Sequence, residues 1–300
     1  MKVLFSGATG FLGKNIIPLL PRDFDVKTVG RSAENHFQAD LSMDPLSFPE
    51  EAFDVVIHAA GKAHSVPKTE KEKQLFHDVN YIGTVRLCEG LERQTLPKAF
   101  VFISSVAVYG RDSGTGIDED HPLEGDSPYA LSKIKAENIL IDWCGYHGVT
   151  LSIVRPSLIA GPHPPGNLGA MIRGIQSGKY LSIAGGKARK SVVMVDDIAR
   201  VIPSLIDKGG IYNLCDDTHP TFSDLEALIA SQLGKSPPYS IPIYLARGIA
   251  KIGDLLGSAA PVNSDKLDKI IRSLTFSNEK AKSVLGWKPL DVLSHFHIGQ

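Results

Sequence analysis

Short runs of apolar and β-branched residues alternate with longer amphipathic stretches through the first half of the chain. The runs are Val3–Phe5, Val26–Val29, Val55–Ile57, Phe100–Ile103 and Leu151–Val154. Strands that are apolar on both faces are typical of a buried parallel sheet. The stretches between them, including Phe76–Arg93 and Tyr129–Tyr146, predict helices. This alternation favours an α/β fold built on a doubly wound parallel sheet.

The pattern changes after Arg155. A loop rich in Gly and Pro, Gly161–Gly166, precedes two further predicted helices and one strand. These are Leu168–Gln176, Phe222–Leu233 and the strand Ile211–Leu214. The apolar stretch Ile241–Ala260, interspersed with Gly and Lys, fits either a membrane-surface helix or, the preferred interpretation, a core helix of a smaller C-terminal lobe.

Composition narrows the class of protein. The chain has 300 residues, which is more than one compact core usually holds. Its 32 Lys and Arg balance 33 Asp and Glu, so we expect no general attraction to nucleic acid and any basic patch to be local. The three cysteines form no CxxC pair, and we expect neither a disulfide framework nor a metal site. Without a secretory leader pattern or an apolar run of about 18 residues, we expect a cytoplasmic protein without membrane insertion.

A glycine-rich turn directly follows the first predicted strand and opens a helix. Its spacing is GxxGxxG, and the three glycines permit a tight turn, close backbone approach to a pyrophosphate, and helix–strand packing. Backbone N–H groups at such a helix start bind phosphates. The turn predicts a dinucleotide site that contains Gly7, Thr9, Gly10, Phe11, Leu12 and Gly13.

The residue after the second strand indicates which dinucleotide is preferred. An acidic residue there binds the ribose hydroxyls of NAD, whereas an arginine accommodates the 2′-phosphate of NADP. This chain has Arg31 at that position, so we expect NADP(H), with NAD(H) as the alternative. Asp40 and Leu41, slightly downstream, are predicted to receive the adenine.

Tyr129 and Lys133 are four residues apart on one predicted helix face, with Ser127 as its N-cap and Pro128 at its first position. A free phenol has a pKa near ~10, and a neighbouring ammonium together with a positively charged nicotinamide lowers it. That arrangement suits proton transfer on an alcohol or ketone. Ser105, at the carboxyl end of the strand Phe100–Ile103, is placed to bind the same substrate oxygen.

Together these residues resemble the extended short-chain dehydrogenase/reductase family, in its NAD-dependent epimerase/dehydratase branch. The resemblance runs nearly end to end. Its motifs are Gly7–Gly13, Val56–Gly61, Asn80–Thr84, Ser105, Tyr129 with Lys133, Arg155–Pro156, Gly161–Pro162, Val195–Ala199, Tyr212–Leu214 and Leu285–Pro289. It implies a Rossmann lobe over residues 1–160 plus about 191–215, and a substrate-binding lobe over 161–190 and 216–300.

The resemblance also implies roles. Ser105, Tyr129 and Lys133 correspond to the catalytic triad. Further cofactor contacts fall on Ala59, Ala60, Gly61, Asn80 and Pro156, besides Tyr129 and Lys133. Substrate contacts fall on Ser105, Asn167, Leu168, Arg189 and Lys190. The family has a phosphate-binding arginine where this chain has Lys190, and a lysine cannot provide the bidentate geometry.

Departures from the family pattern separate its branches. The 4,6-dehydratases carry an Asp-Glu pair after the catalytic hydroxyl residue, where this chain has Val106 and Ala107, so that activity is not expected. The segment Ser273–Ala281 resembles bacterial UDP-sugar 4-ketoreductases of surface-polysaccharide pathways. We therefore expect a homodimeric, NADP(H)-dependent reductase of a nucleotide-diphosphate sugar, most simply a UDP-sugar. A UDP-sugar 4-epimerase with retained NAD is the alternative, and a non-catalytic NADP(H) sensor is a third hypothesis.

Overall fold

A computed structural model describes residues 1–48, 52–255 and 263–299. At its centre lies a seven-stranded sheet in the order β11-β7-β5-β4-β1-β2-β3, and all neighbouring strands are parallel. The strands are β1 (Lys2–Ser6), β2 (Asp25–Gly30), β3 (Phe37–Gln38), β4 (Val55–His58), β5 (Ala99–Ile103), β7 (Thr150–Pro156) and β11 (Gly210–Leu214). The predicted α/β fold with a doubly wound parallel sheet is confirmed.

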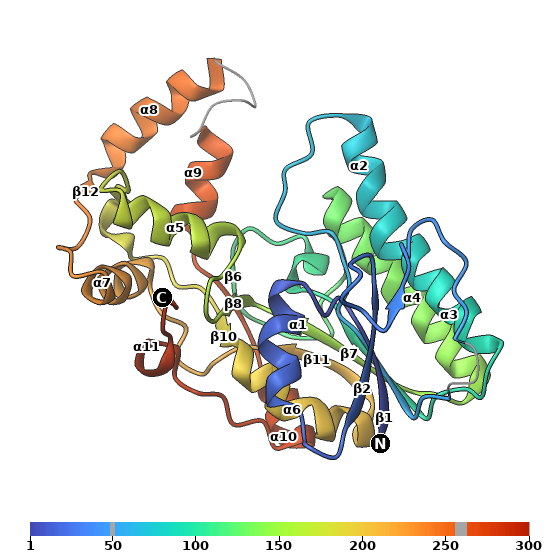
Figure 1. Cartoon of the computed structure of the whole chain (residues 1–300). Coiled ribbons are helices and arrows are strands. Elements are labelled where there is room, and N and C mark those ends of the chain that lie inside the picture. Colours follow the sequence, from blue (N-terminus) through green and yellow to red (C-terminus); the bar gives the residue numbers. More distant parts are fainter. Residues whose placement is uncertain (49–51, 256–262, 300) are drawn as a thin grey trace.

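Helices cover both faces of this sheet (Figure 1). On one face α1 (Phe11–Ile16), α6 (Val195–Lys208) and α10 (Glu279–Leu285) pack against Val3 and Phe5. On the other face α3 (Gly83–Glu92) and α4 (Pro128–His147) share a core with Leu4 and Val56. Because successive side chains of a strand point to opposite faces, both must be apolar when both are covered. This requirement explains the continuous apolar runs in the sequence.

The predicted helix Phe76–Arg93 is three helical segments. α2 (Glu70–Phe76) ends where the prediction begins, a π-helical segment (His77–Ile82) follows, and α3 continues to Glu92. The prediction missed α2 because its side chains are mostly charged, and only Phe76 is buried in it. Short π-helical segments are frequent at functional sites, and this one contains Asn80.

The helix α4 begins and ends where the sequence indicates. The Ser127 hydroxyl accepts a hydrogen bond from the Ala130 N–H at 3.1 Å, and Pro128 is the first helical residue. Gly148, at φ 67°, ends the helix in a left-handed conformation that glycine adopts without strain. These caps fix where Tyr129 and Lys133 leave the first turns of the helix.

A smaller group of elements lies beside the sheet, on the left in Figure 1. Its strands form three two-stranded pairs: β8 (Leu158–Ala160) with β10 (Val192–Met194), β9 (Ser182–Ile183) with β12 (Ser240–Ile241), and β6 (Gly114–Ile117) with β13 (Leu274–Phe276). Its helices are α5 (Gly166–Gln176), α7 (Phe222–Gln232), α8 (Ile243–Leu255), α9 (Ser264–Ile271) and α11 (Val292–His295). α5 and α7 enclose a core of their own with β8, β10 and α11.

The predicted helix Ile241–Ala260 corresponds to α8, and its last part lies outside the described residues. Ala246 and Ala250 are buried beside Leu267 of α9, as a core helix requires. Leu245, on another side of the helix, is 51% exposed. The prediction that this segment is a core helix therefore holds for one side of α8 only. No helix within the described residues is long and apolar enough to cross a bilayer.

Candidate active site

The glycine turn lies at the carboxyl end of β1, in the middle of the sheet. Gly7 has φ 83°, and a Cβ there would lie 2.7 Å from the backbone nitrogen of Ala60. A Cβ at Gly13 would lie 2.4 Å from Cα of Ala8, so α1 can pack on the turn only without a side chain. Gly10 is the N-cap of α1 and supplies no side chain to the first N–H groups. The turn thus keeps its backbone open to a ligand.

The other predicted residues of this turn have different surroundings. Thr9 is exposed, whereas Leu12 packs against the core on the α6 side of the sheet. The Phe11 ring approaches Gly161, where a Cβ would lie 3.5 Å from Cζ. Phe11 therefore brings the glycine turn close to the loop that leads into the smaller lobe.

Arg31 and Asp40 lie at the β2–β3 end of the sheet. Arg31 is exposed directly after β2. Asp40 Oδ1 accepts hydrogen bonds from the Ser42 N–H at 2.9 Å and the Ser42 hydroxyl at 2.6 Å. Burial raises the pKa of Asp40, but these bonds and the charges of Arg31 and Arg86 lower it, and the net direction is down. The side chain of Leu41 is buried in the core, which leaves its backbone as the part that a ligand could contact.

Two buried side-chain atoms of the described residues have no hydrogen-bond partner, Nη1 of Arg86 and Oγ of Ser157. Arg86 lies on α3 at the Asp40 end, since its charge acts on that carboxyl. Ser157 directly follows Pro156, the last residue of β7, which lies toward the other end of the strand order from β2. Buried polar groups are normally satisfied, so these atoms indicate a polar ligand. An extended dinucleotide that runs from β2 past the glycine turn to β7 fits both atoms.

Beyond β4, a chain of hydrogen bonds orients the loop that contains Ala59, Ala60 and Gly61. The Ala60 N–H donates to Ser6 Oγ at 3.2 Å, and Ser6 Oγ lies 2.5 Å from His58 Nδ1. His58 Nε2 lies 2.9 Å from Thr84 Oγ1, which itself donates to the Asn80 carbonyl at 2.6 Å. Since the Thr84 proton is committed to Asn80, His58 donates from Nε2 and accepts at Nδ1.

His58 stays neutral in this position. Burial, together with the nearby positive charge of Lys133, lowers its pKa to about 3. The Asn80 side chain then binds both backbone groups of Lys62, with 2.6 Å from the Lys62 N–H to Oδ1 and 3.1 Å from Nδ2 to the Lys62 carbonyl. Asn80 Nδ2 also donates to Ser132 Oγ on α4 at 2.8 Å. Asn80 thereby joins the π-helical segment, the loop after β4 and the helix of Tyr129.

The structure places the Ser105 hydroxyl close enough to the Tyr129 phenol to act on its pKa. Ser105 has extended backbone, and its hydroxyl also accepts from the Ala107 N–H at 3.2 Å as the N-cap of a 3-10 helix (Val106–Tyr109). Burial raises the pKa of Tyr129, while the hydrogen bond from Ser105 lowers it, and the net direction is up. The sequence predicts a lowered pKa with an oxidised nicotinamide beside it. The protein groups by themselves keep the phenol protonated instead.

Lys133 lies one turn further along α4 and is 4% exposed. Its Nζ donates to the Ile103 carbonyl at the end of β5 at 2.8 Å and lies 4.6 Å from the centre of the Phe102 ring. A Cβ at Gly61 would lie 3.4 Å from this Nζ, so the loop after β4 passes beside the ammonium. Burial lowers the pKa of Lys133 and the Glu137 carboxylate opposes this in part, with a net value of about 8.

A buried polar network stands behind Lys133. The Glu137 carboxylate accepts from Arg155 Nε at 3.1 Å and Nη2 at 2.6 Å, and from the Ser104 hydroxyl. Arg155 Nη1 donates to the Tyr109 oxygen at 3.0 Å, and the Tyr109 hydroxyl donates to Asn213 Oδ1 at 2.7 Å. The network connects α4 to β5, β7 and β11, the strands whose carboxyl ends carry the predicted catalytic groups.

The predicted substrate residues lie apart from the triad, in the smaller lobe. Asn167 is exposed in the first turn of α5, while the Leu168 side chain is buried in the core of that lobe. A Cβ at Gly166 would lie 2.6 Å from Nδ1 of His64, so the loop after β4 meets the start of α5. Asn167 is therefore at the junction of the two lobes. The side chain of Leu168 is buried, so only its backbone could contact a substrate.

Arg189 and Lys190 bind backbone carbonyls. Arg189 Nη1 donates to the carbonyls of Thr218 and His219 at 3.4 and 3.0 Å. Lys190 Nζ donates at 3.0 and 2.9 Å to two carbonyls at the C-terminal end of α9, where a cation is favoured. Burial lowers the pKa of Lys190. Both basic groups thus hold the smaller lobe together before any ligand binds.

Four residues of this site were missed by the sequence analysis. Glu137 could have been found, because it continues the row of Tyr129 and Lys133 at the same four-residue spacing. His58 lies inside a quoted motif, but nothing in the sequence shows that its ring is bonded on both sides. Arg86 and Ser157 give no pattern, because their unsatisfied atoms become visible only in the folded chain.

Comparison with known proteins agrees with this geometry. The model of the NAD dependent epimerase/dehydratase family matches residues 3–215. The N-acetyl-alpha-D-glucosaminyl-diphospho-ditrans,octacis-undecaprenol 4-epimerase of Escherichia coli O157:H7 is 28% identical over 94% of this chain and 88% of its own length. The UDP-glucose 4-epimerase of Vibrio cholerae is 28% identical over 97% of this chain and 92% of its own.

Solved structures share the fold along nearly the whole chain. RMD from Pseudomonas aeruginosa, complexed with NADPH, superposes with a TM-score of 0.76 at 21% identity and covers 99% of this chain and 96% of its own. The UDP-glucuronic acid 4-epimerase from Bacillus cereus, in complex with NAD, has a TM-score of 0.75 at 20% identity and covers 98% and 95%. At this identity, the likeness to these two structures supports the fold.

Proposed function

The chain belongs to the NAD-dependent epimerase/dehydratase family and is an NAD(P)-dependent enzyme of the short-chain dehydrogenase/reductase type, and from this premise we propose that it reduces the C4 ketone of a UDP-sugar with NADPH. The observation that carries the proposal is the position of Ser105 beside Tyr129, with Lys133 one turn away and an arginine rather than an acidic residue directly after β2. The bound nicotinamide would supply the hydride.

In this proposal each triad residue has one task. Ser105 donates to the sugar C4 oxygen and holds it beside Tyr129. Tyr129 gives its proton to that oxygen, and the raised pKa of its buried phenol keeps the proton available at neutral pH. The Lys133 ammonium stabilises the phenolate that remains and binds the nicotinamide ribose. Ser157, with its unpartnered hydroxyl, is a further candidate for the nicotinamide end.

Proton transfer at the neighbouring sugar carbons has no obvious group in this segment. The two residues after Ser105 are Val106 and Ala107, which cannot accept or donate a proton. Elimination of water, as in 4,6-dehydratases, needs such groups. This difference supports chemistry confined to C4, either reduction or epimerisation.

The cofactor preference separates those two outcomes. An epimerase must retain its reduced cofactor until the keto sugar has turned, whereas a reductase exchanges cofactor in every cycle. Arg31 is exposed and is joined at that end by the unsatisfied Arg86, which supports binding of a 2′-phosphate by two arginines. The two solved structures hold NADPH and NAD respectively, so the choice depends on this chain's own residues.

The substrate is proposed as a nucleotide-diphosphate sugar held by the smaller lobe, with Asn167 and the backbone of Leu168 at the nucleotide and Arg189 and Lys190 near the phosphates. Both curated relatives named above act on diphosphate-linked sugars according to their names. For Arg189 and Lys190 this role requires that they exchange carbonyl partners for phosphate oxygens. The proposed setting is surface-polysaccharide biosynthesis.

We further propose a homodimer in the cytoplasm. The family resemblance suggests a dimer through the helices that contain Phe76 and Tyr129. Leu131 and Ile141 are exposed apolar side chains on α4, the helix of Tyr129, and Leu75 is exposed next to Phe76 on α2. The three cysteines are buried and unpaired, which suits a reducing compartment. A sensor without turnover is disfavoured, because both Tyr129 and Lys133 are retained.

The test is a pair of parallel reactions. NADPH is supplied with a UDP-4-keto-6-deoxy-hexosamine, and the loss of reduced-nicotinamide absorbance is followed together with the product mass. UDP-galactose, UDP-glucose and their N-acetyl forms are incubated without added cofactor. Stoichiometric consumption of NADPH with no interconversion of the finished sugars is expected. Interconversion by protein that carries its own NAD would establish the epimerase instead.

A further inference from the structure

The helix α8 carries a stripe of exposed apolar side chains. Leu245 and Ile249 are each 51% exposed, Ile252 is 62% exposed and Tyr244 is 69% exposed. Positions 245, 249 and 252 follow one another at four- and three-residue spacing, so they lie in one row along the helix. A row of large apolar side chains in water is unfavourable unless another surface covers it.

This stripe is not a loosely packed core. The opposite side of α8, with Ala246 and Ala250, is buried against Leu267 of α9. Asp254 fixes the same pair of helices, since its carboxylate accepts from the Ser264 N–H at 2.9 Å and hydroxyl at 2.6 Å. The two helices extend away from the rest of the smaller lobe, at the top of Figure 1. The stripe therefore belongs to a helix that is held in place by α9 and lies at the edge of the molecule.

Basic residues accompany the stripe. Arg247 and Lys251, four residues apart, are exposed on a third side of the helix, away from both the stripe and the buried alanines. Residues 227–253, which include α8 as far as Gly253 and end just before Asp254, contain three basic residues and no Asp or Glu. Residues 167–195 contain five basic residues and no Asp or Glu. Because the whole chain has a net charge of -1, these segments concentrate positive charge on one part of the molecule.

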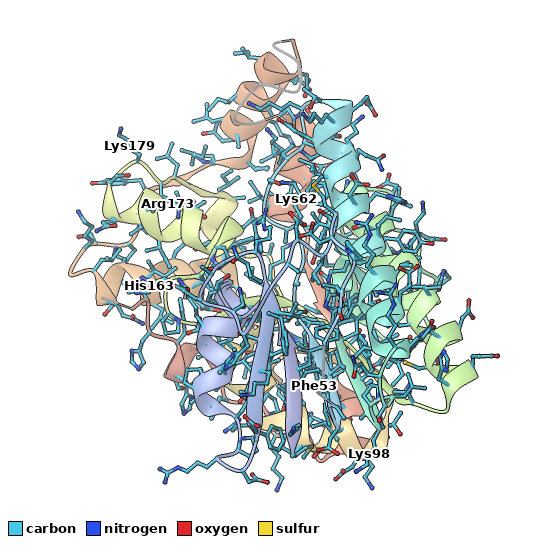
Figure 2. All side chains as sticks on the ribbon, turned by 45° about the vertical axis from the view of Figure 1, so that its right-hand side comes forward. Phe53, Lys62, Lys98, His163, Arg173 and Lys179 are labelled. Carbon is cyan, nitrogen blue, oxygen red and sulfur yellow. The ribbon has the colours of Figure 1, made fainter. Side chains whose placement is uncertain are left out.

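The two basic segments meet next to α8. β9 and β12 pair as parallel strands, and the Ser182 N–H donates to the Tyr239 carbonyl at 2.9 Å. Beside these strands Tyr239 is 88% exposed and Leu181 is 52% exposed, which adds apolar area at the start of α8. Figure 2 shows Lys179 at the outer edge of the same lobe, with Arg173 nearby on α5. Apolar and basic groups thus share this edge.

We propose that α8 docks the protein on the surface of a bilayer that contains anionic phospholipid. A helix with an exposed apolar stripe on one side and Lys and Arg on its polar side is the pattern by which a helix lies in the headgroup region without spanning the membrane. Exposed tyrosines favour the same interface. A second copy of the chain is a poorer occupant, because a two-fold contact through this stripe would bring the basic segments of both copies near one another. The inference does not depend on the proposed reaction.

The experiment is flotation of the full-length protein with vesicles. One set contains equimolar phosphatidylglycerol and phosphatidylethanolamine, and the other contains phosphatidylcholine alone. We expect the protein to float with the anionic vesicles and to remain below the neutral ones, with binding reduced by salt. Ile249→Glu/Ile252→Glu should lower the partition coefficient at least about tenfold, because it places charge in the apolar stripe. Arg247→Gln/Lys251→Gln should lower it roughly 25-fold, as two basic groups at roughly fivefold each.

The matched control is Val284→Glu, which places a charge on an exposed apolar position of α10, 44% exposed, at the other end of the molecule in Figure 1. It should float like the wild type. Unchanged circular dichroism and thermal melting of all variants show that folding is intact. The proposal is overturned if the wild type ignores anionic vesicles or if Ile249→Glu/Ile252→Glu floats equally well. It is also overturned if that variant instead splits a stable dimer, which would make the stripe a contact between copies.

Discussion

Arg155 holds Glu137 through two parallel hydrogen bonds, in a place where the side chains are 3% and 1% exposed. The pair ties β7 to α4, one turn after Lys133. A buried ion pair of this kind contributes little net stability compared with apolar residues, but removal of one partner leaves an uncompensated charge. The position of this ion pair indicates that it holds the part of α4 that carries Lys133 and Tyr129 in place against β7.

We therefore predict that Glu137→Gln lowers the free energy of unfolding by about 3–5 kcal/mol. Urea unfolding measures this loss. The double variant Glu137→Gln/Arg155→Met should recover a large part of it, since it removes the stranded charge. The exposed pair Asp268–Arg272 on α9 is the control, and Asp268→Asn should change stability by less than about 1 kcal/mol. A Glu137→Gln protein as stable as the wild type would contradict the role given to this pair.

Tyr129→Phe tests the acid–base assignment. The variant keeps the ring and its contact with Phe76, and loses only the hydroxyl that would pass the proton. We expect unchanged cofactor binding and a fall in turnover of about 10²–10⁴-fold. Tyr146→Phe, at a position on the same helix that is 87% exposed, should leave turnover unchanged. Substantial turnover by Tyr129→Phe would mean that the proton moves by another route.

The cofactor preference is tested at Arg31. Arg31→Ala should weaken NADPH binding by about 1.5–3 kcal/mol and leave NADH binding nearly unchanged, because only NADPH carries the 2′-phosphate. Titration of both cofactors into wild type and variant gives the four affinities. Arg86→Met should weaken NADPH in the same direction if the unsatisfied Nη1 faces that phosphate. The exposed Arg22→Ala is the control, and equal affinity of the wild type for both cofactors would refute the preference.

The sheet could be predicted from the sequence, because burial on both faces forces apolar runs such as Phe100–Ile103. β3 could not, since two residues leave no pattern. The first turn of α4 could also be predicted, because Ser127 and Pro128 are local signals. The π-helical segment after α2 contains Asn80, whose bonds to Lys62 and Ser132 are long-range and leave no local pattern in the sequence.

The candidate site divides in the same way. Residues in motifs, such as Ser105 and Tyr129, could be predicted as site residues before the fold was known, and the fold places them near one another. The substrate residues were less accessible to sequence reasoning. The side chain of Leu168 is buried in the core of the smaller lobe, where it cannot contact a substrate. The Lys190 ammonium is hydrogen-bonded to a carbonyl of α9, about 80 residues away in the chain, and no local pattern predicts that bond.

The last prediction concerns the dependence of stability on pH at Lys133. Burial lowers the pKa of this lysine to about 8, whereas its ordinary value is 10.5. Below pH 8 both folded and unfolded chains carry the proton, and the cost of a buried ammonium is fully present. Between pH 8 and 10.5 the unfolded chain binds more protons at this site than the folded one, so the contribution of Lys133 to stability rises with pH.

Lys133→Met removes this contribution. We therefore expect the free energy of unfolding of the wild type to gain on that of Lys133→Met between pH 8 and 10.5, and the difference to be constant below pH 8. Urea unfolding at a series of pH values measures both curves, with the exposed Lys71→Met as control. Turnover should change in the opposite direction and fall above about pH 8, because the ammonium that supports Tyr129 is then lost. Parallel stability curves for wild type and Lys133→Met across this window would show that the lysine titrates normally, and a fall in turnover above pH 8 could then not be assigned to loss of its charge.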